Sequence, residues 1–384
     1  MRIGVGTTVW AKGAQSGHLD GIGVYTREIW RALLKCAENQ EQEFRFTPFA
    51  FGREIPALDC GRPLAIANHY SAYALRAAAT GPSRRISAAI SDQVDLFHAT
   101  DHHIPQLKGV PVVANVMDLI PMIHPEWASS TLRRTKNWLF SKTIRSADHL
   151  ITISEFSKRD LIEHLSIDPE RISVTPLGVG AEYFEEIPSA KRHQILAELG
   201  LEPGCFLFVG TLQPRKNLQR VINAHQLLPP ALRKEHPLII VGRTGWKSDE
   251  LLESLRQLEA RGEGRRFEYL PGTTVRALLQ SAAALVFPSL YEGFGLPVVE
   301  AFAARCPVIT SNTTSLPEVA GDAALLVDPT QEEAIAAAML ELLEHPDQAA
   351  RRVDLGQQRA LHYSWEACAM QTLDVYRHIA PPRS

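Results

Sequence analysis

Short apolar runs alternate along the chain with longer segments in which apolar residues recur at helical spacing. In the first half the apolar runs predict strands at 3–10, 44–51, 94–99, 112–117, 150–154 and 172–176. Amphipathic segments between them predict helices at 22–36, 131–146 and 155–165, the last with Ser154 as its N-cap. This alternation is typical of a parallel sheet with helices on both faces.

The same alternation starts again after an irregular stretch that ends near Pro188. Strands are expected at 205–210, 238–242, 267–270, 284–287, 308–310 and 324–327. We therefore predict an α/β protein with two Rossmann-like, doubly wound domains that face a cleft. The first domain spans 1–185 and the second 186–364, and a last helix at 365–380 is expected to pack back on the first. In such sheets ligands bind beyond the carboxyl ends of the strands.

Composition narrows the class of protein. The 384 residues are 45% hydrophobic and 22% charged, as in an ordinary globular protein, and the net charge of -3 provides no basic field for nucleic acid. No apolar run approaches the roughly 20 residues that span a bilayer, and the chain starts directly in a predicted strand. Five widely spaced cysteines favour a reducing compartment over a disulfide framework or a zinc site. A cytoplasmic protein is the expectation.

Two cations lie in the loop that follows the predicted strand at 205–210. Gly210 ends that strand, Arg215 and Lys216 follow it, and Asn217 is placed to cap the next helix. A glycine at a strand end lets a ligand approach the backbone, and a helix N-terminus favours an anion. The segment therefore suits a diphosphate, although by itself it also fits a solvated basic turn. It is not a P-loop, because Arg215 stands where Walker A requires glycine.

A second glycine-containing loop follows a later apolar strand. Gly293 and Gly295 leave backbone N–H groups accessible to phosphate oxygens. Glu292 lies in this loop and Glu300 in the helix after it, with seven residues between them. Two carboxylates so placed can accept hydrogen bonds from sugar hydroxyls on either side of a diphosphate. An ordinary turn followed by an amphipathic helix is a poor explanation for this combination.

These segments resemble the retaining glycosyltransferases of family 4, which have two Rossmann-like domains in the type B arrangement. The resemblance rests on VGT at 209–211, RKN at 215–217, FPS at 287–289, EGFGLP at 292–297, EA at 300–301 and SLPEV at 315–319. In the first half it includes GIGVYT at 21–26, DLFH at 95–98 and TISEFS at 152–157. It thus covers nearly the whole chain and implies transfer of a hexose from a nucleotide-sugar with retention of configuration.

The resemblance also implies roles for individual residues. Arg215 and Lys216 would hold the donor's diphosphate. Glu292 would contact hydroxyls of the transferred sugar, and Glu300 would bind the ribose hydroxyls. The other positions implied in donor binding, several of them through the main chain, are Gly210, Thr211, Leu270, Val275, Gly293, Phe294, Gly295 and Leu296.

One position in the first domain departs from the family pattern. Gly21 and Gly23 match it and would let a loop approach the donor phosphate and the acceptor, but Met117 stands where family members usually carry a histidine. A thioether cannot exchange a proton, so a side-chain acid/base role would fall to Asp118 or to a nearby histidine. Asp118 equally suits a structural turn. The histidines in question are His98, His102 and His103.

The chemistry expected at this site needs no metal or cofactor. The chain has no Asp-x-Asp motif, which would offer a carboxylate clamp for a metal-bound diphosphate. A likeness to bacterial mannosyltransferases of surface polysaccharide (O-antigen) synthesis favours GDP-mannose as the donor, and UDP-glucose or UDP-N-acetylglucosamine stays open. Two further classes also stay open: a nucleotide-sugar epimerase, and a non-catalytic nucleotide-sugar-binding subunit, which Met117 would favour.

The acceptor implied by the resemblance is a saccharide or a polyprenyl-linked saccharide. The predicted helix at 131–146 carries five cations together with aromatic residues. Such a helix can lie peripherally on an anionic membrane. A helix that packs by its apolar face and exposes a solvated basic face explains the same pattern.

Overall fold

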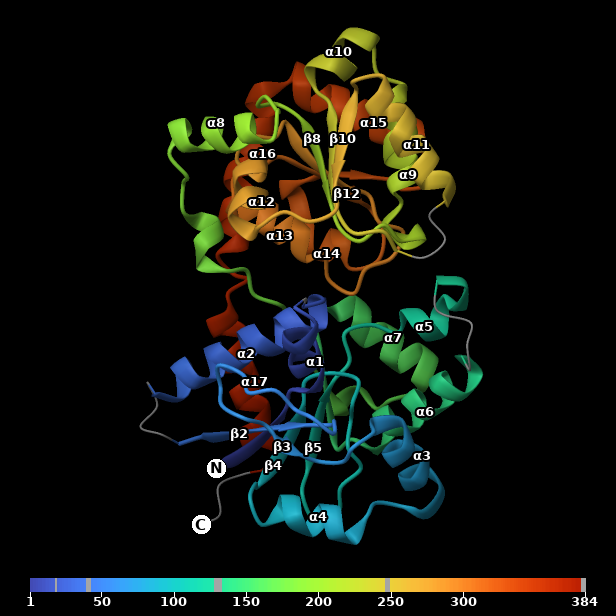
Figure 1. Ribbon diagram of the computed structural model, residues 1–384, viewed down its shortest axis with the longest axis vertical. Coiled ribbons are helices and arrows are strands. Elements are labelled where there is room, and N and C mark those ends of the chain that lie inside the picture. Colours follow the sequence, from blue (N-terminus) through green and yellow to red (C-terminus); the bar gives the residue numbers. More distant parts are fainter. Residues whose placement is uncertain (18, 39–42, 128–132, 246–248, 381–384) are drawn as a thin grey trace. The chain divides into compact units, whose positions relative to one another are not determined.

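Each of two units is built around its own parallel sheet (Figure 1). The computed structural model describes residues 1–17, 19–38, 43–127, 133–245 and 249–380. Unit 1 comprises Met1–Gly178 with Trp365–Ser384, and unit 2 comprises Val179–Ser364. The boundary that the sequence suggested, after residue 185, falls within unit 2. The two parallel sheets confirm the predicted α/β class.

The sheet of unit 1 has seven parallel strands in the order β3-β2-β1-β4-β5-β6-β7. Ile3 of β1 pairs with Phe46 of β2 on one side and with Leu96 of β4 on the other. The direction in which successive strands are added reverses between β1 and β4, which makes this the switch point where ligands bind. The strands are β1 (Arg2–Gly6), β2 (Arg45–Ala50), β3 (Leu64–Ala65), β4 (Leu96–Ala99), β5 (Val112–Asn115), β6 (His149–Thr152) and β7 (Ile172–Val174).

Helices bury apolar side chains against both faces of this sheet. Tyr73, Ile90 and Ile144 belong to the core on one face, and Trp10, Ile29 and Tyr376 to the core on the other. The helices are α1 (Thr8–Ser16), α2 (Gly21–Glu38), α3 (Tyr70–Thr80), α4 (Arg84–Ser91), α5 (Ile120–Ile123), α6 (Arg133–Ser146), α7 (Glu155–Leu165) and α17 (Trp365–Ile379), with short 3₁₀ turns at Pro125–Trp127 and Pro169–Arg171.

The last helix, α17, belongs to unit 1 although it follows all of unit 2 in sequence. It packs along α2, where the rings of Tyr25 and Trp365 have centroids 6.1 Å apart. The hydroxyl of Tyr376 reaches Nδ1 of His98 at 2.6 Å, inside the core. The chain therefore returns to complete the first core with its C-terminal apolar helix.

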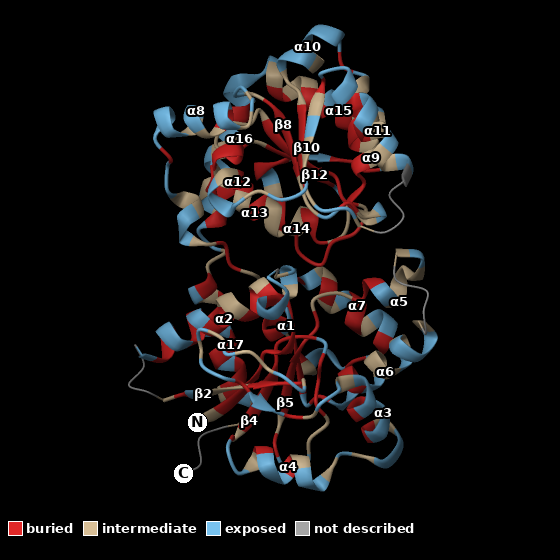
Figure 2. Ribbon diagram, viewed as in Figure 1, coloured by how far each residue is buried: buried red, intermediate tan, exposed pale blue. Residues whose placement is uncertain are grey.

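The sheet of unit 2 has six parallel strands in the order β10-β9-β8-β11-β12-β13, with its switch point between β8 and β11. The strands are β8 (Phe206–Val209), β9 (Leu238–Val241), β10 (Gly264–Phe267), β11 (Ala284–Phe287), β12 (Val308–Ser311) and β13 (Leu325–Val327). Its central strands are buried on both faces (Figure 2), because helices cover both sides of a parallel sheet.

The helices of unit 2 follow the strands in turn. They are α8 (Ser189–Glu198), α9 (Leu218–Gln226), α10 (Pro230–Glu235), α11 (Asp249–Ala260), α12 (Gly272–Leu279), α13 (Leu296–Ala303), α14 (Leu316–Ala320), α15 (Glu332–Glu344) and α16 (Pro346–Ala360), with 3₁₀ turns at Ala181–Phe184, Pro214–Lys216 and Gly321–Ala323. No helix of the described residues, in either unit, is long and apolar enough to cross a membrane.

Two of the predicted strands are wrong in part. The strand expected at 3–10 ends at Gly6, and α1 begins at Thr8, where the Asp101 carboxylate accepts the N–H of Val9 and satisfies one donor of the first turn. The strand expected at 267–270 lies at 264–267. It is an edge strand, so polar side chains are tolerated where apolar ones were expected.

The predicted helix at 155–165 is confirmed, including Ser154, whose Oγ accepts the N–H of Ser157 at 3.0 Å. The helices expected at 22–36 and 365–379 are confirmed as well. Of the helix expected at 131–146, residues 131 and 132 lie outside the described residues, and the remainder forms α6.

Candidate active site

The loops after β8 and β11 carry the charged residues that the sequence singled out. These strands are neighbours in the sheet of unit 2, on either side of its switch point. Parallel strands end at the same edge, so the two loops leave the sheet side by side. The backbone N–H of Leu290 in one loop donates to the carbonyl of Arg215 in the other at 2.7 Å. The fold thereby joins residues about 75 positions apart in the chain into one site.

Arg215, Lys216 and Glu292 form an ion-paired cluster between these loops. Nη1 of Arg215 lies 2.9 Å from Oε2 of Glu292, and Nζ of Lys216 lies 2.6 Å from Oε1. Nη1 of Arg215 also donates to the carbonyl of Tyr291 at 3.2 Å. The Lys216 ammonium lies 4.6 Å from the centroid of the Phe287 ring, which adds a cation–π contact.

The cluster is electrostatically biased toward binding anions. Burial alone would raise the pKa of Glu292, but Lys216 and Arg215 outweigh it and lower the pKa to about 2. Glu292 is therefore ionised at neutral pH. Two cations and one carboxylate leave a net charge of +1 at the switch point, where a ligand would enter.

Polar residues beneath the loops hold this arrangement, and sequence analysis did not single most of them out. The Oγ of Ser315 lies 2.9 and 3.0 Å from the carbonyl oxygens of Glu292 and Phe294, and its single proton is shared between them. The Oγ of Ser311 donates to the carbonyl of Ser289. Both hydroxyls are fully buried. The segment SLPEV contained one of them, but its sequence gives no sign of which carbonyls it satisfies.

Asn217 does not cap α9 with its side chain as expected. Its backbone is left-handed, with φ of 62°, and its Nδ2 donates to the carbonyls of Pro288 and Pro329 at 2.9 and 2.6 Å. Asparagine tolerates this backbone region better than most residues. Its role is therefore to tie the cationic loop to two other loops of unit 2.

Close backbone packing explains one glycine that the sequence analysis overlooked. A Cβ on Gly242, at the end of β9, would lie 1.9 Å from the carbonyl oxygen of Gly210. Gly295 has φ of 108°, and a Cβ there would lie 2.6 Å from Cδ2 of Leu316. Neither position can carry a side chain without movement of the loops that hold the cluster.

Glu300 lies on α13, one to two turns beyond the glycine loop, and its environment differs from that of Glu292. Burial raises the pKa of Glu300 to about 7, which the hydrogen bond from the Tyr183 hydroxyl partly opposes. Glu182, on the same 3₁₀ turn as Tyr183, raises it further. Glu300 is thus a partly protonated carboxyl that no cation neutralises among the groups that set its pKa.

The remaining donor-binding candidates occupy several positions in unit 2. Gly293, Phe294 and Gly295 are buried in the loop itself, and Leu296 begins α13. Thr211 is exposed in the cationic loop. Leu270 and Val275 lie after β10, two strands from β8, and the Val275 side chain is buried, so only its main chain could face a ligand.

The candidates in the first half of the chain lie in unit 1. Gly21 and Gly23 do not form a loop: Gly21 begins α2, and the N–H of Gly23 donates to Oδ1 of Asp20 at 2.8 Å. The Asp118 carboxylate accepts the N–H of Ile120 at 3.0 Å, where α5 begins. This contact is the structural role that the sequence left open for Asp118, and a catalytic role for it stays a prediction.

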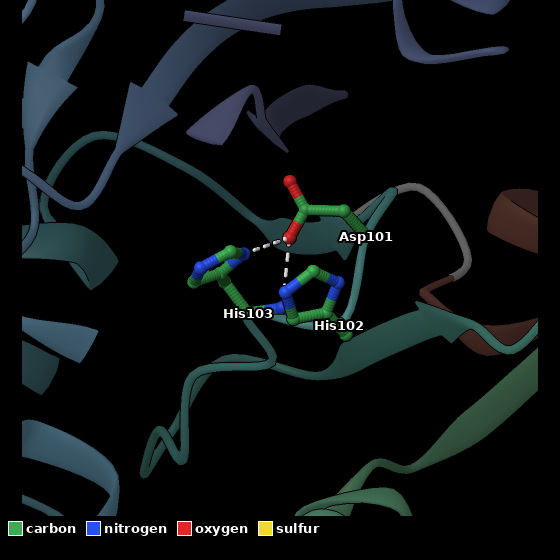
Figure 3. A group of neighbouring side chains, drawn as sticks. All are labelled: Asp101, His102 and His103. Atoms are coloured by element: carbon green, nitrogen blue, oxygen red, sulfur yellow. Dashed lines mark hydrogen bonds and ion pairs between the residues drawn. The ribbon is translucent and has the colours of Figure 1, made fainter. Parts of the chain in front are cut away.

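The three histidines of unit 1 differ in their surroundings. His98 is fully buried, with its ring between Asn115 and Tyr376, and burial lowers its pKa to about 4. It has no access to a substrate in this fold. His102 and His103 follow β4 at the switch point of unit 1, next to Asp101 (Figure 3).

Asp101, His102 and His103 are the one group of potential metal ligands found in the described part of the chain. Their surroundings do not suit a metal. The Nζ of Lys12 lies 3.1 Å from Nε2 of His103, where a metal would have to bind, and an ammonium repels a cation. The Asp101 carboxylate is occupied by the ring and backbone N–H groups of His103 and by the N–H of Val9.

Solved structures share this fold. Sucrose-phosphate synthase from Thermosynechococcus elongatus matches with a TM-score of 0.75 at 18% identity, over 98% of both chains. WaaG, a glycosyltransferase involved in lipopolysaccharide biosynthesis, matches with a TM-score of 0.69 at 16% identity over the whole of both chains. The two doubly wound units therefore have the type B fold that these structural neighbours share.

Comparisons of sequence identify the family. The Glycosyltransferase Family 4 model matches residues 19–183, and the model for glycosyl transferases group 1 matches residues 193–359. The O-antigen chain mannosyltransferase B of Escherichia coli is 31% identical over 94% of this chain and 96% of its own. The MMP α-(1→4)-mannosyltransferase of Mycolicibacterium hassiacum is 30% identical over 65% of this chain and 59% of its own.

The chain belongs to glycosyltransferase family 4 and is a retaining hexosyltransferase. Membership of this family decides against the epimerase and the non-catalytic subunit that the sequence left open.

Proposed function

We propose that this protein transfers mannose from GDP-mannose to a saccharide or lipid-linked saccharide acceptor in the synthesis of a surface polysaccharide. The ion-paired cluster of Arg215, Lys216 and Glu292 carries the proposal, because it presents a net positive charge at the switch point of unit 2. The choice of mannose is supported by two relatives, O-antigen chain mannosyltransferase B of Escherichia coli and O-antigen chain mannosyltransferase RfbU of Salmonella typhimurium.

In this proposal, Arg215 and Lys216 stabilise the departing nucleoside diphosphate. Cleavage of the bond between sugar and phosphate puts negative charge on the leaving group and positive charge on the sugar. Hydrogen-bond donors that are already fixed where charge develops lower the activation free energy strongly. Loss of one such contact raises it by about 3–4 kcal/mol. Glu292 fixes both cations before the donor binds.

Glu292 also binds hydroxyls of the transferred sugar in this proposal. With a pKa of about 2 it remains a carboxylate, which can accept hydrogen bonds and cannot protonate a leaving group at neutral pH. Its pairing with two cations makes it a poor nucleophile. We therefore favour transfer on one face of the sugar, in which a leaving phosphate oxygen accepts the proton of the acceptor hydroxyl.

Glu300 would bind the ribose hydroxyls of the donor. Its carboxyl has a pKa of about 7, so it is ionised in only part of the molecules at neutral pH. Hydroxyl donors from a ribose would favour the carboxylate form and lower that pKa on binding. No step of this proposal uses a metal ion.

Contact with an anionic membrane is a further part of the proposal. In α6 the apolar side chains Leu139 and Phe140 pack toward the core of unit 1, whereas Trp138 is 51% exposed. The Lys142 ammonium lies 5.3 Å from the centroid of the Trp138 ring. A helix face with exposed tryptophan and several cations suits an anionic surface. Flotation with anionic liposomes at low salt tests this, and absence of co-flotation would contradict it.

Thermal unfolding with nucleotides tests the donor site. The full chain is melted with GDP, UDP, ADP and their sugar conjugates, with and without EDTA. A ligand at 100 times its Kd stabilises the protein by about 2.7 kcal/mol, which raises the midpoint by several degrees. Of these ligands, we expect only GDP and GDP-mannose to raise the unfolding midpoint. The rise should be the same with and without EDTA.

The same measurement can contradict the proposal at two levels. A rise with uridine nucleotides only would replace the donor by UDP-glucose or UDP-N-acetylglucosamine and leave the site intact. No rise with any nucleotide would remove the donor site from the loops after β8 and β11. Incubation with radiolabelled GDP-mannose and a membrane extract, followed by counting of label in the polysaccharide, then tests the transfer itself.

A further inference from the structure

Unit 1 has a cavity of about 740 Å³ at the carboxyl edge of its sheet. Its walls come from segments that follow three adjacent central strands: α1 after β1, residues 51–56 after β2, and His103 after β4. The start of α3 closes a further side. The cavity therefore adjoins the switch point between β1 and β4, which is where open parallel sheets bind their ligands.

An aromatic wall orients His103 in this cavity. The ring of Tyr70 lies edge-on to that of His103, with centroids 4.7 Å apart, and edge-on to Phe51 at 5.1 Å. The imidazole of His103 is buried behind these rings and has little freedom to turn. Phe51 and Tyr70 give the wall an apolar surface, and His103 gives it a polar one.

Asp101, His103 and Lys12 form a chain of hydrogen bonds that ends at the cavity. Oδ1 of Asp101 lies 2.7 Å from Nδ1 of His103, and Nε2 of His103 lies 3.1 Å from Nζ of Lys12 (Figure 3 shows the first two residues). An ammonium can only donate, so Nε2 accepts, and the ring proton stays on Nδ1, where it donates to Asp101. This series of hydrogen bonds uses one of the three N–H groups of Lys12 and fixes the ammonium at the cavity wall.

The charges around the cavity favour an anionic ligand. Lys12 and Arg53 line it against a single carboxylate, that of Glu54. Arg62 lines an adjoining cavity of about 580 Å³, which shares residues 53–56 and Gln15 with the first. Among the described residues that line the two cavities, Lys and Arg therefore outnumber Asp and Glu by three to one.

We infer that this cavity binds the acceptor and that Lys12 holds a phosphate group which the acceptor carries. The inference rests on the proposed function, because it takes the molecule bound here to be the acceptor of the hexose. Arg53 supplies a second cation, the aromatic wall contacts the sugar, and His103 is a positioning residue that holds Lys12. The phosphate belongs either to the saccharide itself or to the diphosphate of a lipid-linked saccharide.

Titration calorimetry on the full chain without nucleotide tests the inference. Three probes are compared: methyl α-mannoside, mannose 6-phosphate, and a mannoside linked through diphosphate to a hexyl chain. We expect both phosphorylated probes to bind more tightly than the uncharged one. Loss of a hydrogen bond to a charged group costs about tenfold in affinity, so K12M should weaken both phosphorylated probes by about tenfold and leave methyl α-mannoside unchanged.

Two further variants frame this result. K12R keeps the cation and should recover most of the affinity. K108M removes an exposed lysine of unit 1 that lines neither cavity, and should leave all three affinities unchanged. Tighter binding of the diphosphate probe would assign the phosphate to a lipid diphosphate, and tighter binding of mannose 6-phosphate would assign it to the saccharide.

Other outcomes would overturn the inference. Equal affinity for charged and uncharged probes, or equal loss in K12M and K108M, would remove the phosphate site. Weaker binding of the phosphorylated probes in R215A, with no change in K12M, would place the phosphate at the loops of unit 2. The donor is tested separately, because GDP-mannose binding should be unchanged in K12M. If GDP-mannose fails to bind while the phosphorylated probes still bind, the proposed donor is wrong and the acceptor cavity stands.

Discussion

The two sheets have the same type of switch point, but the side chains placed there differ in character. In unit 2 the cations Arg215 and Lys216 are neutralised in part by Glu292, and all three are largely buried. In unit 1 the cation Lys12 is exposed at the edge of a cavity, and the acid behind it, Asp101, is linked to it through the ring of His103.

This difference has a consequence for stability and for binding. A buried ion pair depends on both partners, because the loss of one leaves an uncompensated charge in a site of low polarity. An exposed cation remains hydrated when its partner is removed. We therefore expect substitutions in the cluster of unit 2 to affect folding and turnover, and those at Lys12 to affect binding alone.

The largest expected effect is on turnover in R215A. With saturating GDP-mannose, kcat should fall by about 10²–10³-fold, because one fixed hydrogen-bond donor to the leaving diphosphate is lost. The rate of mannose transfer from GDP-mannose measures this. Turnover within about threefold of the natural protein would contradict the role of Arg215 at the leaving group.

E292Q should lower the stability of unit 2. The substitution leaves Arg215 and Lys216 without their carboxylate, and breaking a buried pair from one side costs about 3 kcal/mol. Differential scanning calorimetry should show a lower unfolding midpoint for the transition of unit 2. K12M is the matched variant in unit 1, and its midpoint should be unchanged. Equal shifts in both variants would contradict the contrast between the two switch points.

G242A tests whether the cationic loop depends on close backbone packing. Its Cβ would meet the carbonyl oxygen of Gly210 at 1.9 Å, so one of the two strand ends must move, at about 1–3 kcal/mol. The free energy of unfolding, measured with denaturant, and the affinity for GDP should both fall. G272A, where a Cβ meets nothing within 4 Å, is the control for the steric effect and should leave the free energy of unfolding unchanged.

The smallest expected effect is the pH dependence of nucleotide binding through Glu300. Its pKa of about 7 in the free protein means that a ribose, which favours the carboxylate, binds more weakly as the pH falls below 7. The Kd for GDP-mannose, whose diphosphate does not titrate in this range, should be about tenfold higher at pH 6 than at pH 8. Glu292, with a pKa of about 2, adds no slope in this range.

E300Q provides the control for this pH profile, because an amide does not titrate and the profile should become flat. A profile that stays steep in E300Q would assign the effect to another group. The same raised pKa also links to folding. Protonated Glu300 contributes fully to the free energy of unfolding below the ordinary pKa of 4.5. This contribution is lost as the pH rises through about 7.

Most of the helices and strands could be predicted from the chain, because apolar periodicity is a local property. The strand at 284–287 and the helix at 155–165 have the predicted bounds. Prediction was wrong where a distant contact decided the local structure. At the start of the helix at 8–16, Asp101, far along the chain, accepts the N–H of Val9, and no local pattern contains that contact.

The candidate site divides in the same way. The residue types of the donor loops follow from the sequence, since glycine, cations and carboxylates have conformational and charge properties that hold in any fold. Only the tertiary structure pairs Glu292 with both Arg215 and Lys216, sets its pKa far below that of Glu300, and joins Lys12 to Asp101 through His103. These are properties of distance and burial between residues remote in sequence, and the order of strands in each sheet determines them.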